Sequence, residues 1–157
     1  MTLNAHEFLV AERDDDFYKD NPHAFKRIFK IDLSAATDLE NVQSQGNCFQ
    51  DPEQGLLIDG LTLEQYVLQQ GWEGLAQQGI YPVNKTLLVD LIEQLQYPHD
   101  KVEGLWRIDQ QHLAILNDDD YAFSEHDGVI QQKYLDQAKT VIDGNRLYIV
   151  SGLDLNT

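Results

Sequence analysis

Two acidic runs are the features of this sequence whose residue types and spacing could do chemistry. Residues 14–16 are three consecutive aspartates, and residues 117–120 read Asn-Asp-Asp-Asp. Adjacent like charges repel one another, so such runs either stay in water or gather around a cation. Calcium takes roughly six to eight oxygen ligands, typically from carboxylates, carbonyls and waters. The acidic runs therefore leave two interpretations open, a calcium site and a solvated turn.

The run at residues 117–120 follows a predicted strand, which limits how many of its side chains could reach one ion. If the strand continues, alternation places Asn117 and Asp119 on one face and Asp118 and Asp120 on the other. At most two or three of them could then reach one ion, unless the chain turns there. The run also departs from an EF-hand loop, since alanine and phenylalanine follow where that loop needs an oxygen ligand and a glycine.

Glu12 and Arg13 form the second unusual feature, because they follow the apolar stretch Phe-Leu-Val-Ala directly. A strand that ends in opposite charges could present both to a cleft, or could form a surface ion pair of little energetic value. The sequence contains no Gly-rich phosphate loop, no Gly-x-Ser-x-Gly elbow and no His-Glu-x-x-His motif. The five histidines are scattered, and each is expected on the surface or in a turn.

Short segments of alternating apolar and polar residues would have to position these side chains. They predict strands at residues 8–12, 27–33, 85–91, 102–109, 112–116 and 146–150. The segments 102–109 and 112–116 are separated by two residues, which is typical of a hairpin. These patterns predict a mainly β fold.

The remaining segments have weaker patterns. Residues 61–70 predict one short helix, capped by Thr62. Residues 39–54 are rich in Asp, Asn, Gln and Pro and predict a long loop. Residues 124–142 are compatible with either helix or strand. We expect one domain over residues 1–157.

The composition excludes several classes of partner. The 157 residues include 27 acidic and 11 basic side chains, which gives a net charge of −16. This charge repels phosphate backbones and anionic lipid, so we expect neither nucleic acid nor a membrane surface as a partner. The first residues lack the basic and apolar regions of a secretory signal. The single cysteine, Cys48, excludes an internal disulfide and a Cys-based zinc site.

Several segments, taken in order over roughly residues 7–150, resemble one family. They are Glu-Arg-Asp after an apolar strand at residue 12, Lys-Arg-Ile-Phe-Lys-Ile-Asp-Leu from residue 26, Lys-Thr-Leu-Leu-Val-Asp-Leu from residue 85, Lys-Val-Glu-Gly-Leu from residue 101, and Asn-Asp-Asp-Asp from residue 117. In this order they are similar to the phytase-like domain family, also called the esterase-like activity of phytase family.

The resemblance implies a fold and a location. It implies part of a β-propeller, with antiparallel blades, long polar loops and one or two short helices. Members of the family are longer and usually exported to the periplasm or outside the cell, and the matched segments correspond to their C-terminal blades. We therefore expect a propeller fragment whose open sheet edges need self-association or a partner chain to cover them.

The resemblance also implies a metal site. Glu103 matches the glutamate of the family's Glu-Gly-Leu motif, and Asn117, Asp118 and Asp120 match three positions of its Asn-Asp-Asn-Asp motif. Asp119 departs from that motif, because it replaces the second asparagine. By analogy with related propeller phosphatases, we expect Glu103, Asn117, Asp118 and Asp120 to bind calcium.

The catalytic expectation rests on the matching Glu-Arg pair. Glu12 and Arg13 would act at the mouth of the channel, where Arg13 would meet an anion. Calcium would allow so acidic a protein to bind a phosphate ester or another small anionic substrate. Two functions stay open: calcium-dependent phosphoester hydrolysis in the full-length family, and a non-catalytic propeller fragment that acts as a binding or structural module.

Overall fold

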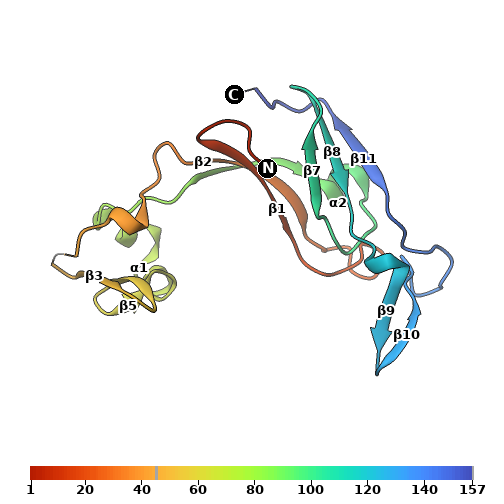
Figure 1. The fold of residues 1–157 in the computed structure, drawn as a ribbon, viewed down its shortest axis with the longest axis horizontal. Coiled ribbons are helices and arrows are strands. Elements are labelled where there is room, and N and C mark those ends of the chain that lie inside the picture. Colours follow the sequence, from red (N-terminus) through yellow and green to blue (C-terminus); the bar gives the residue numbers. More distant parts are fainter. Residues whose placement is uncertain (45, 157) are drawn as a thin grey trace. The chain divides into compact units, whose positions relative to one another are not determined.

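The computed structural model describes residues 1–44 and 46–156. This part of the chain is mainly β, with four small antiparallel sheets and few helices (Figure 1). The strands are β1 (Glu7–Arg13), β2 (Lys26–Asp32), β3 (Cys48–Asp51), β4 (Gly55–Ile58), β5 (Leu61–Thr62), β6 (Asn84–Asp90), β7 (Gly104–Arg107), β8 (His112–Leu116), β9 (Phe123–His126), β10 (Val129–Gln132) and β11 (Leu147–Ser151). The helices are α1 (Leu63–Gln77) and α2 (Leu91–Leu95), with 3-10 turns η1 (Leu39–Asn41) and η2 (Asp120–Ala122).

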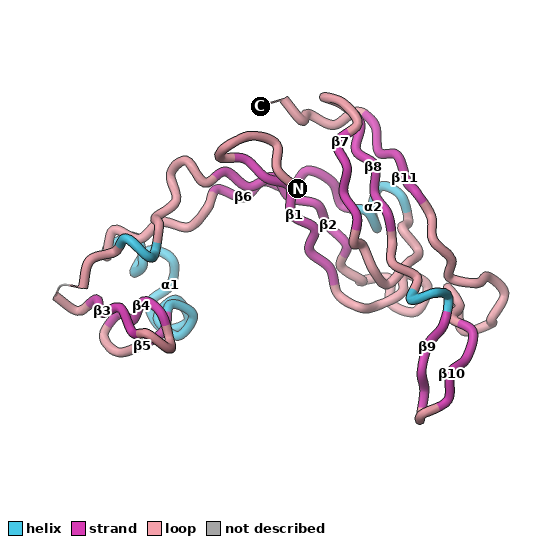
Figure 2. Tube along the Cα trace, in the orientation of Figure 1, coloured by secondary structure: helices cyan, strands magenta, loops and turns pink. Residues whose placement is uncertain are grey.

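The chain divides into two compact units. Unit 1 comprises Met1–Ile31 and Lys85–Thr157, and unit 2 comprises Asp32–Asn84. Strand order is β1-β2-β6, β11-β8-β7 and β10-β9 in three sheets, and β3-β4-β5 in the fourth. Long loops join many of these strands, as Figure 2 shows in pink. The expectation of one domain over residues 1–157 stays a prediction.

The core of unit 1 lies between its two three-stranded sheets. In β8, Leu113 and Ile115 are fully buried, and they join Leu9 of β1, Ile28 of β2 and Val89 of β6 in one apolar cluster. Strand β8 pairs antiparallel with both β7 and β11, which confirms the predicted hairpin at residues 102–116. The apolar cluster therefore fixes the position of the strands that carry the candidate site residues.

Unit 2 has its own small core beneath α1. Thr62 accepts a hydrogen bond from the Gln65 amide, and the Gln65 side chain accepts one from the Thr62 amide, so the predicted cap is a full capping box. The helix kinks at Gly71, whose φ of 72° favours glycine. The buried side chains of this core are Leu56, Ile58 and Ile80, together with Tyr66 and Leu75 of α1 itself.

One prediction about a connection is wrong, and one segment that the sequence left open between helix and strand is now assigned. Residues 39–54 were expected to form a loop, but they include η1 and the strand β3, which pairs with β4. Strand β3 has four residues, so its periodicity is too short to stand out against polar neighbours. Residues 124–142 begin with the β9–β10 hairpin, and the remainder is irregular apart from a bridge between Tyr134 and Ile142.

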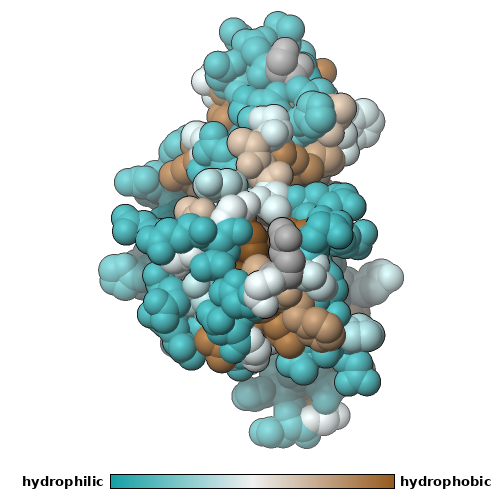
Figure 3. Space-filling model, turned by 90° about the vertical axis from the view of Figure 1, so that its left-hand side faces the viewer, coloured by the Kyte–Doolittle hydropathy of each residue, from teal (hydrophilic) through white to brown (hydrophobic). Residues whose placement is uncertain are grey.

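The described surface mixes acidic with apolar side chains. On the face shown in Figure 3, hydrophilic side chains in teal surround separate hydrophobic patches in brown. The most exposed large apolar side chains are Tyr121, Leu68, Trp106 and Ile130, each more than two-thirds exposed. Among the described helices, none has the length and apolar character needed to cross a membrane.

Candidate functional site

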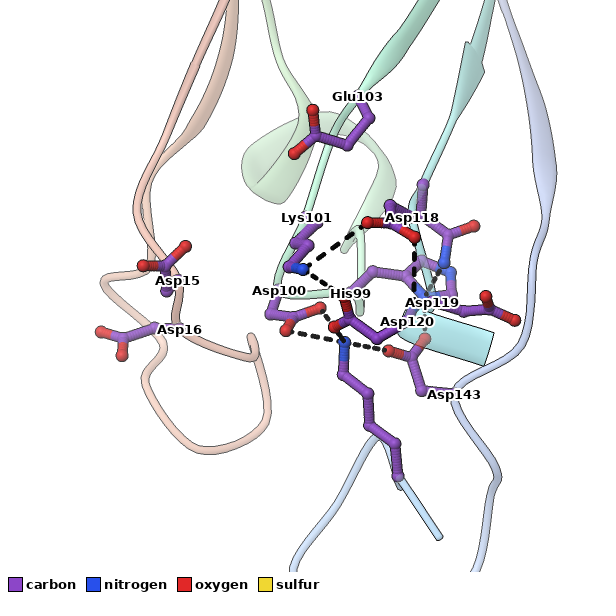
Figure 4. A network of polar contacts seen from close by, with 12 residues as sticks. Asp15, Asp16, His99, Asp100, Lys101, Glu103, Asp118, Asp119, Asp120 and Asp143 are labelled. Atoms are coloured by element: carbon purple, nitrogen blue, oxygen red, sulfur yellow. Dashed lines mark hydrogen bonds and ion pairs between the residues drawn. The ribbon is translucent and has the colours of Figure 1, made fainter. Parts of the chain in front are cut away.

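Four segments of unit 1 meet where β8 ends. They bring together the side chains that we call the acid–lysine cluster: Asp100, Lys101, Asp118, Asp120, Lys133 and Asp143. These residues come from the segment before β7, the turn after β8, the position directly after β10 and the loop before β11, and Figure 4 labels all of them except Lys133. Strand β8 stops at Leu116, and η2 turns the chain at Asp120. The chain therefore does turn within residues 117–120, which was the condition for more of these side chains to lie on one side.

Lys133 is the centre of the buried part of the cluster. Its Nζ atom lies 2.9 Å from Asp100 Oδ2, 2.8 Å from Asp120 Oδ2 and 3.2 Å from Asp143 Oδ2. Burial alone would lower the pKa of Lys133, but the hydrogen bonds to Asp120 and Asp100 raise it overall. The lysine therefore stays charged and holds three carboxylates around one ammonium group.

Lys101 also pairs with carboxylates, at the more exposed side of the cluster. Its Nζ atom lies 2.5 Å from Asp120 Oδ1 and 3.6 Å from Asp118 Oδ2. The hydrogen bond to Asp120 raises the pKa of Lys101. Hydrogen bonds from Lys101 and Lys133 lower the pKa of Asp120. The carboxylates of Asp118 and Asp120 are therefore paired with lysines of the same chain.

The asparagine of the predicted metal set is turned inward. Asn117 is almost fully buried, its Oδ1 accepts a hydrogen bond from the Arg146 amide at 2.7 Å, and its Nδ2 donates to the Gly144 carbonyl at 3.4 Å. Both ends of the amide therefore hold the loop before β11 against the end of β8. Asn117 lies beside the cluster and not in it.

His99 is buried, although the sequence predicts every histidine on the surface or in a turn. It is fully buried, its Nδ1 lies 2.5 Å from Asp143 Oδ1, and its Nε2 lies 2.8 Å from the Tyr148 hydroxyl. The ring also packs edge-on against Tyr97. His99 follows Pro98 in an irregular segment, so no periodicity could mark it as buried.

Arg13 and Glu12 separate, because successive side chains of β1 point to opposite faces. Arg13 Nη2 lies 2.8 Å from Glu103 Oε1, and Arg13 also contacts Asp15. Burial lowers the pKa of Arg13, but these two carboxylates raise it overall. Glu12 instead pairs with Lys85 of β6 at 2.6 Å. The structure thus brings Arg13 to Glu103 but leaves Glu12 elsewhere.

The turn that carries Asp120 has an unusual backbone. Asp120, Tyr121 and Ala122 have φ values of 52°, 60° and 61°, all in the left-handed region that favours glycine. Such conformations cost about 1–3 kcal/mol each where the residue does not suit them, and they occur often at functional sites. The surrounding hydrogen bonds must hold this turn in place, including the one from the Tyr121 amide to Asp119.

The predicted calcium ligands have suitable oxygen atoms, but the structure does not group them closely. The carboxylates of Glu103, Asp118 and Asp120 are 50%, 50% and 39% exposed, and carboxylate oxygens are the ligands that calcium prefers. Asn117 does not fit, because its oxygen already accepts a hydrogen bond. Within residues 1–44 and 46–156, no three His, Cys, Asp or Glu side chains are grouped closely enough to hold a metal ion. The ammonium group of Lys101 already pairs with Asp118 and Asp120, which are two of the predicted calcium ligands.

The comparisons with known proteins identify a family. The family model described as "Phytase-like: Esterase-like activity of phytase" matches residues 1–121. This range includes Arg13, Glu103 and the acidic run up to Asp120, so the match covers the exposed part of the site. Neither the curated proteins nor the solved structures contain a match to the chain. Because the family model covers more than half of the sequence, the chain belongs to the phytase-like family.

Proposed function

We propose that this protein takes part in the hydrolysis of phosphate esters, with calcium bound by Glu103, Asp118 and Asp120, which would have to move closer together than they lie in the described structure. The observation that carries the proposal is the ion pair between Arg13 and Glu103, which lie 90 residues apart in the sequence, together with the exposed carboxylates of Asp118 and Asp120 on the turn after β8. Family membership supports a phytase-like or esterase-like activity. A chain with a net charge of −16 needs bound cations before it can attract a phosphate ester.

The residues would divide the work as follows. Bound calcium would neutralise the charge of the phosphate ester and lower the pKa of a bound water. Arg13 has a planar guanidinium that suits two phosphate oxygens, and it would exchange Glu103 or Asp15 for them. Lys101 would leave Asp118 and Asp120 when calcium binds, and its ammonium group would then be free to donate to the phosphate. Glu12 has no role in this proposal, since Lys85 holds it.

We propose, as the family implies, that the sheets are blades of a β-propeller. The support comes from the sheet β11-β8-β7, which carries apolar side chains on both faces. A blade that is covered by another sheet on each face needs that pattern, whereas an antiparallel sheet with one face in water does not.

The direct test is turnover of a chromogenic phosphate monoester by the purified chain, in calcium and in excess EDTA. We expect turnover that requires calcium and falls at least about 100-fold in Asp118→Asn. The matched control is Asp127→Asn in the β9–β10 turn, where asparagine suits the positive φ of 51°. Turnover that survives EDTA, or no turnover in either condition, would contradict the proposal.

A second function is favoured by a specific observation, the neutralisation of the cluster by its own lysines. Lys101 and Lys133 already satisfy Asp118 and Asp120 without a metal ion. Such a cluster would serve a non-catalytic binding or structural module equally well. In that case calcium would leave the unfolding midpoint unchanged, and Asp118→Asn would have little effect on stability.

A further inference from the structure

The sheet β11-β8-β7 has an outer face that ought to be covered. Its inner face is packed in the core of unit 1 through Leu113, Ile115 and Val150. An antiparallel sheet with one wet face normally alternates apolar and polar residues. Here the alternate positions are apolar as well, although the face is exposed. Figure 1 shows the three strands side by side.

The register aligns the outer side chains in two rows across the sheet. One row is Gly104, Leu116 and Leu147, and the other is Trp106, Ala114 and Ile149. None of these six residues is charged, in a chain that has 27 acidic side chains. The outer face is therefore the part of this sheet at which a second acidic molecule could approach with the least electrostatic repulsion.

The same face carries both a projection and a hollow. Trp106 is 74% exposed and Leu147 is 65% exposed. Beside Trp106, the small residues Gly104 and Ala114 leave a hollow of about 400 Å³, which is also lined by Leu116 and Ile149. A surface with a large ring next to a hollow lined by small residues is complementary to a copy of itself.

The size of the face suits a weak association. Its exposed apolar side chains amount to roughly 500 Å², which is near the largest patch on a typical monomer. Two such faces would bury about 1,000 Å² in total, at the lower end of specific interfaces. Packed sheets lie about 10 Å apart, so a side chain as long as tryptophan can reach into the opposite sheet.

We propose that this face joins two copies of the chain, sheet against sheet about a two-fold axis, with each Trp106 in the hollow of the other copy. A two-fold interface uses the same patch twice, which requires the self-complementarity that Trp106 and the hollow provide. The net charge of −16 on each copy opposes association, so salt should strengthen the dimer by screening that repulsion. This inference does not depend on the proposed hydrolase activity.

The test is sedimentation equilibrium of the purified chain from micromolar to near-millimolar concentration, at low and high salt. We expect a monomer–dimer equilibrium that tightens with salt. Trp106→Ala should raise the dissociation constant at least about tenfold, because a central tryptophan contributes much of the binding energy. Leu147→Asp should do the same by placing two like charges at the interface.

The matched control is Trp72→Ala, since Trp72 lies in unit 2 and is 62% exposed. It should leave the dissociation constant unchanged. Far-UV circular dichroism checks that each variant is folded, which is expected because Trp106 and Leu147 are mainly exposed. A chain that stays monomeric at every concentration would overturn the proposal, and so would dimers that both Trp106→Ala and Leu147→Asp leave intact.

Discussion

The two units of this protein differ in what they bury. Every charged side chain that is buried in the described residues belongs to unit 1: Lys26, Asp90, Asp100, Asp119, Lys133 and Asp143. The buried side chains described in unit 2 are all apolar or aromatic. Burying charge is costly unless the charge is paired, so a fold tolerates it where other demands outweigh stability. The difference points to unit 1 as the part that carries function.

The largest expected effect is the loss of the central ammonium group in unit 1. Lys133→Met leaves Asp100, Asp120 and Asp143 facing one another without their common partner. We expect the free energy of unfolding near neutral pH to fall by about 3–5 kcal/mol, the cost of an uncompensated buried charge. Urea unfolding measures it.

The pH dependence of that loss identifies its cause. In the variant the three carboxylates repel, and protonation relieves them, so the deficit relative to wild type should shrink as the pH falls toward about 4. The control is Lys139→Met, because Lys139 is exposed and should matter by less than about 0.5 kcal/mol. A deficit that is equal at both pH values would break the electrostatic account of unit 1.

The corresponding change in unit 2 removes apolar volume. Ile58 of β4 is fully buried, and Ile58→Ala should lower the free energy of unfolding by about 2–4 kcal/mol through lost burial and a cavity. Because the buried side chains described in unit 2 carry no charge, this loss should be the same at neutral and mildly acidic pH. A clear pH dependence would show that the two units are less distinct than proposed.

The helix caps offer a finer comparison of the two units. Asp90 accepts hydrogen bonds from the Ile92 and Glu93 amides and pairs with Arg27 at 2.5 Å, whereas Thr62 caps α1 with a neutral hydroxyl. Asp90→Asn and Thr62→Ala should each reduce the free energy of unfolding by about 1 kcal/mol. Thermal unfolding at several pH values distinguishes them.

The distinction follows from the pKa of Asp90. Burial raises this pKa, but the bonds from Arg27 and the backbone amides lower it overall from its ordinary value of 3.8. Stability from Asp90 is therefore present above pH 3.8 and is lost as the pH falls through the lower pKa of the folded state. The cost of Asp90→Asn should disappear at such low pH, while that of Thr62→Ala should persist. Parallel behaviour of the two variants would contradict this assignment.

The smallest expected effect concerns Glu12. Its partner Lys85 is 41% exposed, and exposed ion pairs contribute little, so Glu12→Gln should change the free energy of unfolding by about 0.5 kcal/mol or less. It should also leave phosphate-ester turnover within about twofold, since Glu12 lies apart from Arg13 and Glu103. A large loss of turnover with normal stability would show that Glu12 takes part in the reaction.

Much of the fold could be predicted from the sequence, because strands β1, β2, β6, β8 and β11 are short segments rich in apolar residues and α1 begins with a strong cap. The short strands β3 and β4 could not, since four residues hold too little periodicity beside long polar segments. The hairpin β9–β10 was left open for the same reason. Whether the sheets close into a propeller depends on contacts between distant segments, which periodicity does not encode.

The candidate site was predicted in part. Family motifs pointed to Glu103, Asp118, Asp120 and Arg13. In the structure Arg13 pairs with Glu103 and Lys101 pairs with Asp118 and Asp120, and the binding of calcium by these residues stays a prediction. The lysines that neutralise them were not predicted, because Lys101 and Lys133 are 32 positions apart and only the folded chain brings both to Asp120. His99 and Asn117 were likewise placed by tertiary contacts that no local pattern signals.

The most direct test of the proposed function is the thermal unfolding midpoint in excess EDTA and in millimolar calcium, for wild type, Asp118→Asn and Lys101→Met. Ligand at about 100 times its dissociation constant adds about 2.7 kcal/mol, which corresponds to about 5 °C in a domain of this size. We predict such an increase for wild type, none for Asp118→Asn, and tighter calcium binding for Lys101→Met because the competing ammonium group is gone. Equal midpoints with and without calcium in all three proteins would contradict the calcium-dependent hydrolase.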